Sequence, residues 1–181
     1  SKINGLNIGR GGGNITTNTV FGVAALQNNS TGTGNFALGE TALFLNQTGN
    51  DNIAIGSASI RNNISGIRNV GIGNGSLLGN TANGNTGIGR NSIGSNTTGS
   101  NNVAIGNSAG NVIGSGAAGA TILNSSVLIG TDTRPLLDNQ TNQIAIGSSA
   151  IGLGSNTTVL GNTSTVFGRF WGRLLVATSS D

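Results

Sequence analysis

The chain contains few side chains that could carry out chemistry. Its acidic residues are Glu40, Asp51, Asp132, Asp138 and Asp181. Cleavage of a glycosidic bond commonly needs two carboxyl groups about 5 to 9.5 Å apart, and either Glu40 with Asp51 or Asp132 with Asp138 could form such a pair. Asp51, however, lies in an asparagine-rich stretch, where Asp is common because it bonds to its own backbone in turns. We therefore predict no enzymatic activity and no catalytic residue, and polysaccharide degradation is the third of three hypotheses.

Metal and cofactor sites are also not expected. The chain has no Cys and no His, so neither thiolate nor imidazole ligands are available. Gly114–Gly119 has the glycine spacing of a dinucleotide fingerprint but no helix to bring a dipole to a phosphate. Gly9–Asn14 lacks the Lys-Ser/Thr ending of a phosphate loop. The sequence therefore predicts no bound metal and no cofactor.

The composition argues against nucleic-acid binding and membrane insertion. Charged residues make up 7% of the 181 residues and aromatic residues 3%, and the net charge of +3 comes from eight basic residues along the chain. Arg61, Arg68 and Arg90 have no aromatic residues interleaved with them, unlike a typical nucleic-acid face. No apolar run approaches the roughly 20 residues that cross a bilayer.

A short phrase that ends in glycine recurs along the chain, as in Ile53–Gly56 and Val103–Gly106. The closing glycines are Gly22, Gly39, Gly56, Gly73, Gly89, Gly106, Gly130, Gly147 and Gly161. Their successive spacings are 17, 17, 17, 16, 17, 24, 17 and 14 residues. A fixed period of this length indicates a repeat protein whose units stack on one another. Roughly ten coils spaced 4.8 Å apart predict a rod about 48 Å long.

Each repeat unit predicts an all-β coil. In the unit Asn35–Gly49, Phe36 and Leu38 alternate with Ala37, which is the period of a strand. The apolar step Ala42-Leu43 predicts a second short strand, and Asn- and Gly-rich closures predict turns. We expect the large strand residues to fill the coil. The small middle residue then either admits another backbone on the opposite face or simply fits a tight coil.

The regular period is interrupted in three places. We also divide the chain into three regions. Residues 1–18 are expected to be a linker or capping coil, residues 19–168 a β-roll with an insertion near 107–127, and residues 169–181 a cap or junction. The segment Thr133–Asp138 contains the only proline and reads as a turn. Four residues are candidates for contact with another chain or a receptor: Phe44, Phe170, Trp171 and Arg173.

The repeats resemble two related families. The units Asn52–Gly56, Asn102–Gly106 and Gln143–Gly147 closely resemble those of the YadA-like heads of trimeric autotransporter adhesins. The longer form, with an added Ala-Leu step and the closure Asn96–Gly99, is similar to repeats of bacteriophage tail fibres and tailspikes. The resemblance covers about residues 19–168 and implies a left-handed, homotrimeric, parallel β-roll or β-solenoid exposed outside a cell or virion.

The resemblance sets the functional expectation. It implies a structural or adhesive section of a virion tail fibre or tailspike for host attachment, with other tail proteins and a host surface glycan or outer-membrane receptor as partners. The alternative is an adhesin head on a bacterial cell surface. In phage fibres that mature with a C-terminal intramolecular chaperone, self-cleavage occurs at a Ser-Asp junction. Ser180 and Asp181 are therefore a candidate junction, and an arbitrary chain boundary is the other interpretation.

Overall fold

The structure is a computed structural model that describes residues 2–3, 6–116 and 118–165. It contains no α-helix among these residues, only a 3₁₀ turn at Gly12–Asn14. The strands are β1 (Lys2–Ile3), β2 (Leu6–Gly9), β3 (Thr19–Gly22), β4 (Phe36–Leu38), β5 (Ile53–Ile55), β6 (Val70–Ile72), β7 (Thr86–Ile88), β8 (Val103–Ile105), β9 (Leu123–Asn124), β10 (Val127–Ile129), β11 (Gln140–Thr141), β12 (Ile144–Ile146) and β13 (Thr158–Leu160).

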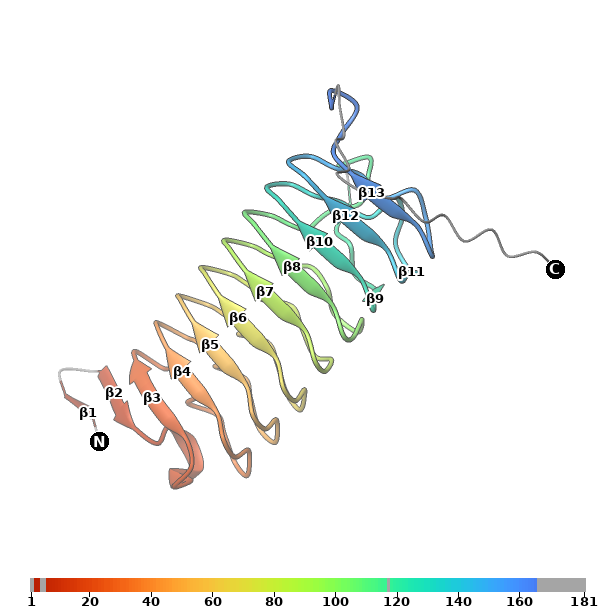
Figure 1. Cartoon of the computed structure of the whole chain (residues 1–181). Helices are drawn as coiled ribbons and strands as arrows, with labels where there is room; N and C mark the ends of the chain where they lie inside the picture. The colour runs from red at the N-terminus through yellow and green to blue at the C-terminus, as the bar shows by residue number, and fades with distance from the viewer. Residues whose placement is uncertain (1, 4–5, 117, 166–181) are drawn as a thin grey trace, which may run out of the picture.

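The main sheet runs along the whole rod (Figure 1). Its strand order is β1-β2-β3-β4-β5-β6-β7-β8-β10-β12-β13, and all pairs from β3 onward are parallel. Each turn of the chain adds one strand beside the previous one. The eight steps from β3 to β13 give a length of about 38 Å at the usual strand spacing. The prediction of an all-β parallel solenoid is confirmed, and the stack of parallel coils has fewer members than the roughly ten that we expected from the sequence.

The middle residue of the strand faces the inside of the coil, and in β4 to β8 and β12 this residue is Ala or Gly. Ala37, Ala54 and Ala104 are at most 1% exposed, whereas Phe36 is 37% exposed. A Cβ on Gly71, the middle residue of β6, would lie only 2.6 Å from the side chain of Ile60. The expectation that the large strand residues fill the coil is therefore wrong. The interior is so narrow that the alternative, small residues fitting a tight coil, is the one observed.

The second apolar step is a pair of turns, not the second strand that we predicted. Ala42 and Leu43 are both fully buried although they are adjacent, which an extended strand does not allow because its side chains alternate between faces. The backbone achieves this with left-handed φ angles of 53° at Thr41 and 52° at Leu43. Ile60 and Ile93 repeat the conformation at 48° and 37°. Each such residue costs about 1–2 kcal/mol, which burial of its side chain offsets.

Buried asparagines join neighbouring coils at two corners. Just before the strands, the side-chain Oδ1 of Asn35 accepts from the backbone N of Asn52 at 3.0 Å, and the Oδ1 of Asn52 accepts likewise from Asn69. This first ladder comprises Asn18, Asn35, Asn52, Asn69, Asn85 and Asn102. Ser126 and Gln143 occupy the same position in the next two coils. The amides thus satisfy backbone donors that the narrow interior hides from water.

A second ladder follows the Asn of each closure and is interrupted at Asn80. The Nδ2 of Asn46 donates to Asn29, and that of Asn63 donates to Asn46 at 2.8 Å. The next coil is one residue shorter. Its Asn80 donates to Ala82 but not to Asn63, and Asn96 donates to Gly99 but not to Asn80. The buried Oδ1 of Asn63 is left without a hydrogen-bond partner. The strands on either side of this interruption still pair in register.

The predicted insertion lies between β8 and β10. The chain leaves the coil after Asn111, and Val112 forms an antiparallel bridge with Gly119 before the chain returns. The returning residues form β9, which pairs in parallel with β11 in a separate two-stranded sheet. Nη1 of Arg134 contacts the carbonyl oxygen of Gly114 at 3.5 Å. The insertion is thus an excursion from one coil that leaves the main sheet continuous.

The N-terminal end of the rod is closed by the chain itself. Strands β2 and β1 add to the edge of β3 in antiparallel orientation. The backbone N of Gly12 donates to the carbonyl oxygen of Leu26 at 2.8 Å, and a Cβ on Gly12 would meet the backbone oxygen of Gln27 at 2.4 Å. The segment that we predicted as a linker or capping coil therefore covers the first coil. The boundary predicted after residue 168 lies outside the described residues.

Candidate interaction face

The outer surface of the main sheet carries two columns of mostly apolar side chains. The leading column is formed by the first residue of each pairing triplet, and the trailing column by the third. In strand order, the leading column contains Thr19, Phe36, Ile53, Val70, Thr86, Val103, Val127, Ile144 and Thr158, and the trailing column contains Phe21, Leu38, Ile55, Ile72, Ile88, Ile105, Ile129, Ile146 and Leu160. We call the two columns together the apolar face.

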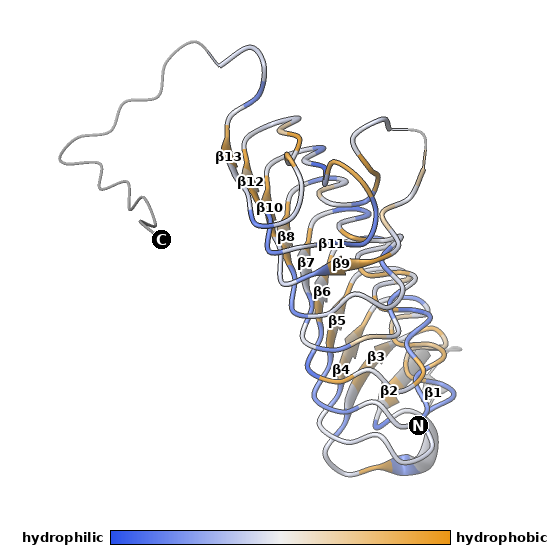
Figure 2. Cartoon of the chain, turned by 90° about the vertical axis from the view of Figure 1, so that its right-hand side faces the viewer, coloured by the Kyte–Doolittle hydropathy of each residue, from blue (hydrophilic) through white to orange (hydrophobic). Residues whose placement is uncertain are grey.

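The side chains of the apolar face are exposed or half-buried, and none of them is charged. The side chains at its two ends are the most exposed, with Phe21 at 49% and Leu160 at 53%. Figure 2 shows the strands along one side of the rod, with hydrophilic turns beside them. Within a strand the two columns lie about 7 Å apart, and along the rod their side chains repeat about every 4.8 Å. A continuous apolar strip of this length is typical of an interaction surface.

The exposure of this face was not predicted from the sequence, because the large strand residues were expected to fill the interior. The residues that share the inward side of β4 are Asn35, Ala37 and Gly39, which are small or can bond to backbone. Leu43 already occupies the space opposite them. These small or polar inward residues, together with the buried apolar step, are the signal in the sequence that Phe36 and Leu38 point out of the coil.

Phe44 lies away from the apolar face, on the part of the coil that returns toward the second asparagine ladder. It is half-buried, and the guanidinium carbon of Arg61 from the next coil lies 5.4 Å from the centre of its ring. This is a cation–π distance. The contact joins two coils of one chain, and the prediction of an interchain or receptor contact at Phe44 stays a prediction.

The structure does not bring Glu40 and Asp51 together. The carbonyl of Glu40 accepts from the backbone N of Ala58, beyond the C-terminal end of β5, whereas Asp51 precedes that strand. The intervening extended chain spans on the order of 15–20 Å, more than the spacing of a glycosidase pair.

Asp132 and Asp138 have structural partners near the insertion. Asp132 forms an ion pair with Arg134. Burial of Asp138 disfavours its charged form, but hydrogen bonds from the hydroxyl of Thr121 and from backbone N–H groups, including that of Ile122 at 2.7 Å, outweigh this effect and lower the pKa of Asp138 below its ordinary value. These contacts hold the insertion against the following coil.

The remaining candidate residues, Phe170, Trp171, Arg173, Ser180 and Asp181, lie outside the described residues. Within the described part of the chain, no cluster of three or more potential metal ligands occurs. No helix in that part has the length and apolarity to cross a membrane.

Comparison with known proteins leaves the apolar face as the main guide to function. No family model, no curated protein and no solved structure matches this chain. The functional interpretation therefore rests on the geometry above and on the repeat resemblance.

Proposed function

We propose that this chain forms a section of a homotrimeric bacteriophage tail fibre or tailspike that takes part in host attachment. The observation that carries the proposal is the continuous apolar face along β3 to β13. Its role is mechanical: three rods bury their apolar faces against one another and form a stiff section between the particle and the host surface. Repeated polar sites on the outside bind weakly, and their contacts add through avidity.

The thin interior of each coil supports association. A regular coil buries one Leu or Ile beside Ala, Ser and Asn, as in the coil that holds Ala42, Leu43 and Asn46. Large apolar residues such as Ile53 and Ile105 remain 39% and 38% exposed. Removing this surface from water would contribute about 25 cal/mol per Å². Among the described residues, burial of the apolar face is therefore the largest additional contribution to stability that association could make.

A rotation axis parallel to the rod suits a fibre section. Chains related by such an axis point in the same direction, so one end can join the particle while the other faces the host. The repeat resemblance supports three chains and a left-handed coil. The charge-free columns would lie toward the axis, and the closures with Asn and Thr would face solvent.

Oligomeric state provides the first test. We expect native mass measurement at micromolar concentration to give three times the chain mass of 17.8 kDa. The double substitution Ile55→Asp and Ile88→Asp places charges in the trailing column and should give monomers. Ile64→Asp is the matched control, because Ile64 is 46% exposed but lies in a closure outside the apolar face. A monomeric wild-type protein with native circular dichroism would contradict the proposal.

Localisation provides the second test and separates the phage proposal from the adhesin alternative. The alternative is favoured by the units such as Asn102–Gly106 that resemble adhesin heads. Antibodies against the purified chain should label the tails of virus particles in electron microscopy and reduce their adsorption to cells. Labelling confined to the surface of bacterial cells would support the adhesin instead.

A further inference from the structure

We propose that the rod bends preferentially between two neighbouring closures, formed by residues 63–66 and 80–82. We call this pair of segments the closure break. At the closure break the outer turns of two coils can separate while the strands of the main sheet remain paired. The proposal concerns a single rod, so it does not depend on host attachment or on the number of chains in a fibre.

The closure break lacks the backbone hydrogen bonds that join other closures to the next coil. The backbone N–H groups of Gln47 and Thr48 donate to the carbonyl oxygen of Ile64 at 2.9 and 3.1 Å. On the other side, the backbone N–H of Thr81 donates to the carbonyl oxygen of Thr97 at 2.8 Å. Across the closure break itself, no backbone hydrogen bond joins the two described segments. The loss is therefore confined to one interface between two intact ones.

A side-chain hydrogen bond is missing at the same place. The Oδ1 of Asn46 accepts from the Nδ2 of Asn63 at 2.8 Å, whereas the Oδ1 of Asn63 has no partner although Asn63 is fully buried. A buried acceptor without a partner has lost its hydrogen bonds to water and gained none in exchange. Opening the closure break lets water reach this oxygen, so the closed arrangement is held more weakly than at a regular interface.

One missing residue is the cause of the closure break. The carbonyl oxygen of Ala82 accepts from the side chains of Asn80 and Asn69. The carbonyl oxygen of Gly66 accepts from the equivalent asparagines one coil earlier. Ala82 therefore occupies the place of Gly66, and the residue that the short closure lacks belongs between Thr81 and Ala82.

The residue type at this place also indicates a looser closure. Regular closures have a glycine there, and a Cβ on Gly49 or Gly99 would overlap the Oδ1 of the Asn in its own closure. The short closure instead has Ala82, which carries a Cβ. It therefore has room that the regular closures do not have.

The other parts of the same interface remain bonded, so the closure break can act as a hinge. Strands β5 and β6 pair in register, with Ile53 opposite Val70. At the apolar step, the backbone N–H of Ile60 donates to the carbonyl oxygen of Ser76 at 2.9 Å. Ile60 and Leu77 are fully buried. Separation of the closures therefore bends the rod about the strands and the apolar step, and the core stays covered.

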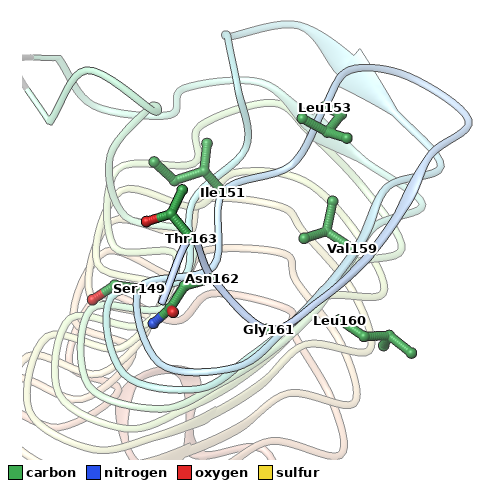
Figure 3. A pocket seen from close by; sticks show the side chains of 8 residues that line it. All are labelled: Ser149, Ile151, Leu153, Val159, Leu160, Gly161, Asn162 and Thr163. Atoms are coloured by element: carbon green, nitrogen blue, oxygen red, sulfur yellow. The ribbon is translucent and has the colours of Figure 1, made fainter. Parts of the chain in front are cut away.

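The opening at the C-terminal end of the described coils is of a different kind. It is a hollow of about 330 Å³ with an apolar lining of Ile151, Leu153, Val159 and Leu160. Figure 3 shows Ile151 on one side of it and Leu153 and Val159 on the other. Widening this hollow would expose apolar side chains to water, which is unfavourable. At the closure break the separating groups are backbone and amide atoms, which water solvates well, so bending is easier there.

Hydrogen exchange of backbone amides measures opening at the closure break. The N–H of Gly84 donates to the carbonyl oxygen of Ile67 at 3.0 Å across the interface that contains the break. The N–H groups of Arg68 and Asn101 make the equivalent bonds across regular interfaces, at 3.0 and 3.1 Å. After correction for intrinsic rates, Gly84 should exchange about tenfold faster than both, the factor that corresponds to one unsatisfied buried group. Equal protection of the three amides would overturn the proposal.

A rebuilt closure provides the second measurement. Insertion of one Thr after Thr81, combined with Ala82→Gly, gives the short closure the Asn-Thr-Thr-Gly sequence of the regular closure that begins at Asn96. This variant should slow the exchange of Gly84 to the rate of Asn101. The matched control is insertion of one Thr after Thr97, which lengthens a complete closure and should speed the exchange of Asn101. Unchanged exchange of Gly84 in the folded rebuilt chain would overturn the proposal.

Spin labels measure the bending directly. The chain has no Cys, so Thr48→Cys combined with Thr98→Cys places two labels on exposed closure residues three coils apart, about 14 Å along the rod. Labelled chain is diluted into unlabelled chain so that only distances within one chain are recorded. The distance distribution should be broader in the wild-type background than in the rebuilt one, and equal widths would overturn the proposal. If the rebuilt chain does not fold, the exchange of Gly84 in the wild type decides alone.

Discussion

The four regular coils between Asn35 and Asn101 and the coils around the insertion contain similar strands but fill their interiors differently. In a regular coil the middle strand residue is Ala or Gly, and a buried Leu or Ile lies opposite it. At the insertion this arrangement is reversed. Gly110 occupies the place of the buried Leu, while the middle residue of β10 is the fully buried Leu128. Leu123 from β9 packs into the same space.

The difference shows that the solenoid conserves interior volume rather than residue type. A Cβ on Gly110 would lie 2.8 Å from side-chain atoms of both Ile93 and Leu128. Because interiors are packed to nearly constant density, a large residue in one position requires a small one opposite. The insertion therefore changes which part of the chain supplies the volume without disturbing the register of the sheet.

The largest difference in stability should come from Ala substitutions of the glycines that follow the strands. Gly56→Ala should lower the unfolding free energy by about 4 kcal/mol, because it combines a strained backbone with overpacking. Gly56 has a φ of 124°, and its Cβ would lie 2.7 Å from the backbone of Gly73. Gly154, near the irregular end, has a similar φ of 116°, but its nearest atom would be 3.6 Å away.

Gly154→Ala is therefore the matched control for the same backbone strain without the clash. We expect it to cost about 1–2 kcal/mol. Urea denaturation followed by circular dichroism measures both variants. Equal losses would show that the distance between coils does not limit residue size at these turns.

Leu128→Ala tests the exchange of volume at the insertion. It should cost about 3 kcal/mol by leaving a cavity. Gly110→Leu should also destabilise the wild-type chain, but its cost should be smaller in the Leu128→Ala background, which resembles a regular coil. A double-mutant cycle in urea measures the coupling, expected to exceed about 0.5 kcal/mol. Additive losses would contradict volume exchange between these positions.

Removing the charge of Asp138 should have the smallest effect on stability among these substitutions. The effect should arise from the contacts between the insertion and the following coil. The folded-state pKa of Asp138 is lowered, so its charged form stabilises the native state above the ordinary value of 3.8. That contribution disappears as the pH falls through the folded-state pKa. Asp138→Asn should therefore lower the melting temperature at neutral pH, and the difference from the wild type should disappear as the pH falls through the lowered folded-state pKa. A constant difference across this range would rule out the charge as the cause.

The sequence was sufficient to predict an all-β solenoid of parallel strands and the period at which those strands recur. The glycine after each strand and the alternation in Ile53–Ile55 are local signals, and local signals specify short strands well. The direction in which those strands face was predicted incorrectly. It depends on Leu43 and its equivalents adopting left-handed backbone angles, which are rare for such residues and arise from packing between coils.

The candidate site shows the same division between local and tertiary information. The residues of the apolar face were identified as strand residues, but their exposure was not, because it follows from how little room the coil leaves. The partners of Asp138 and the pairing of Gly110 with Leu128 join residues far apart in sequence. No repeat pattern encodes such contacts.

The unpaired Oδ1 of Asn63 also says something about how such a rod can change its length over evolution. The following coil lacks one residue and the second asparagine ladder is interrupted there, yet Ile72 and Ile88 still pair across that coil. The loss of one residue is therefore accommodated in the closure of that coil and does not change the register of the other strands. Whole coils can be gained or lost in the same way, each changing the reach of the rod by about 4.8 Å. The length of the rod is therefore set by the number of coils and by the backbone spacing between them, not by the identity of their side chains.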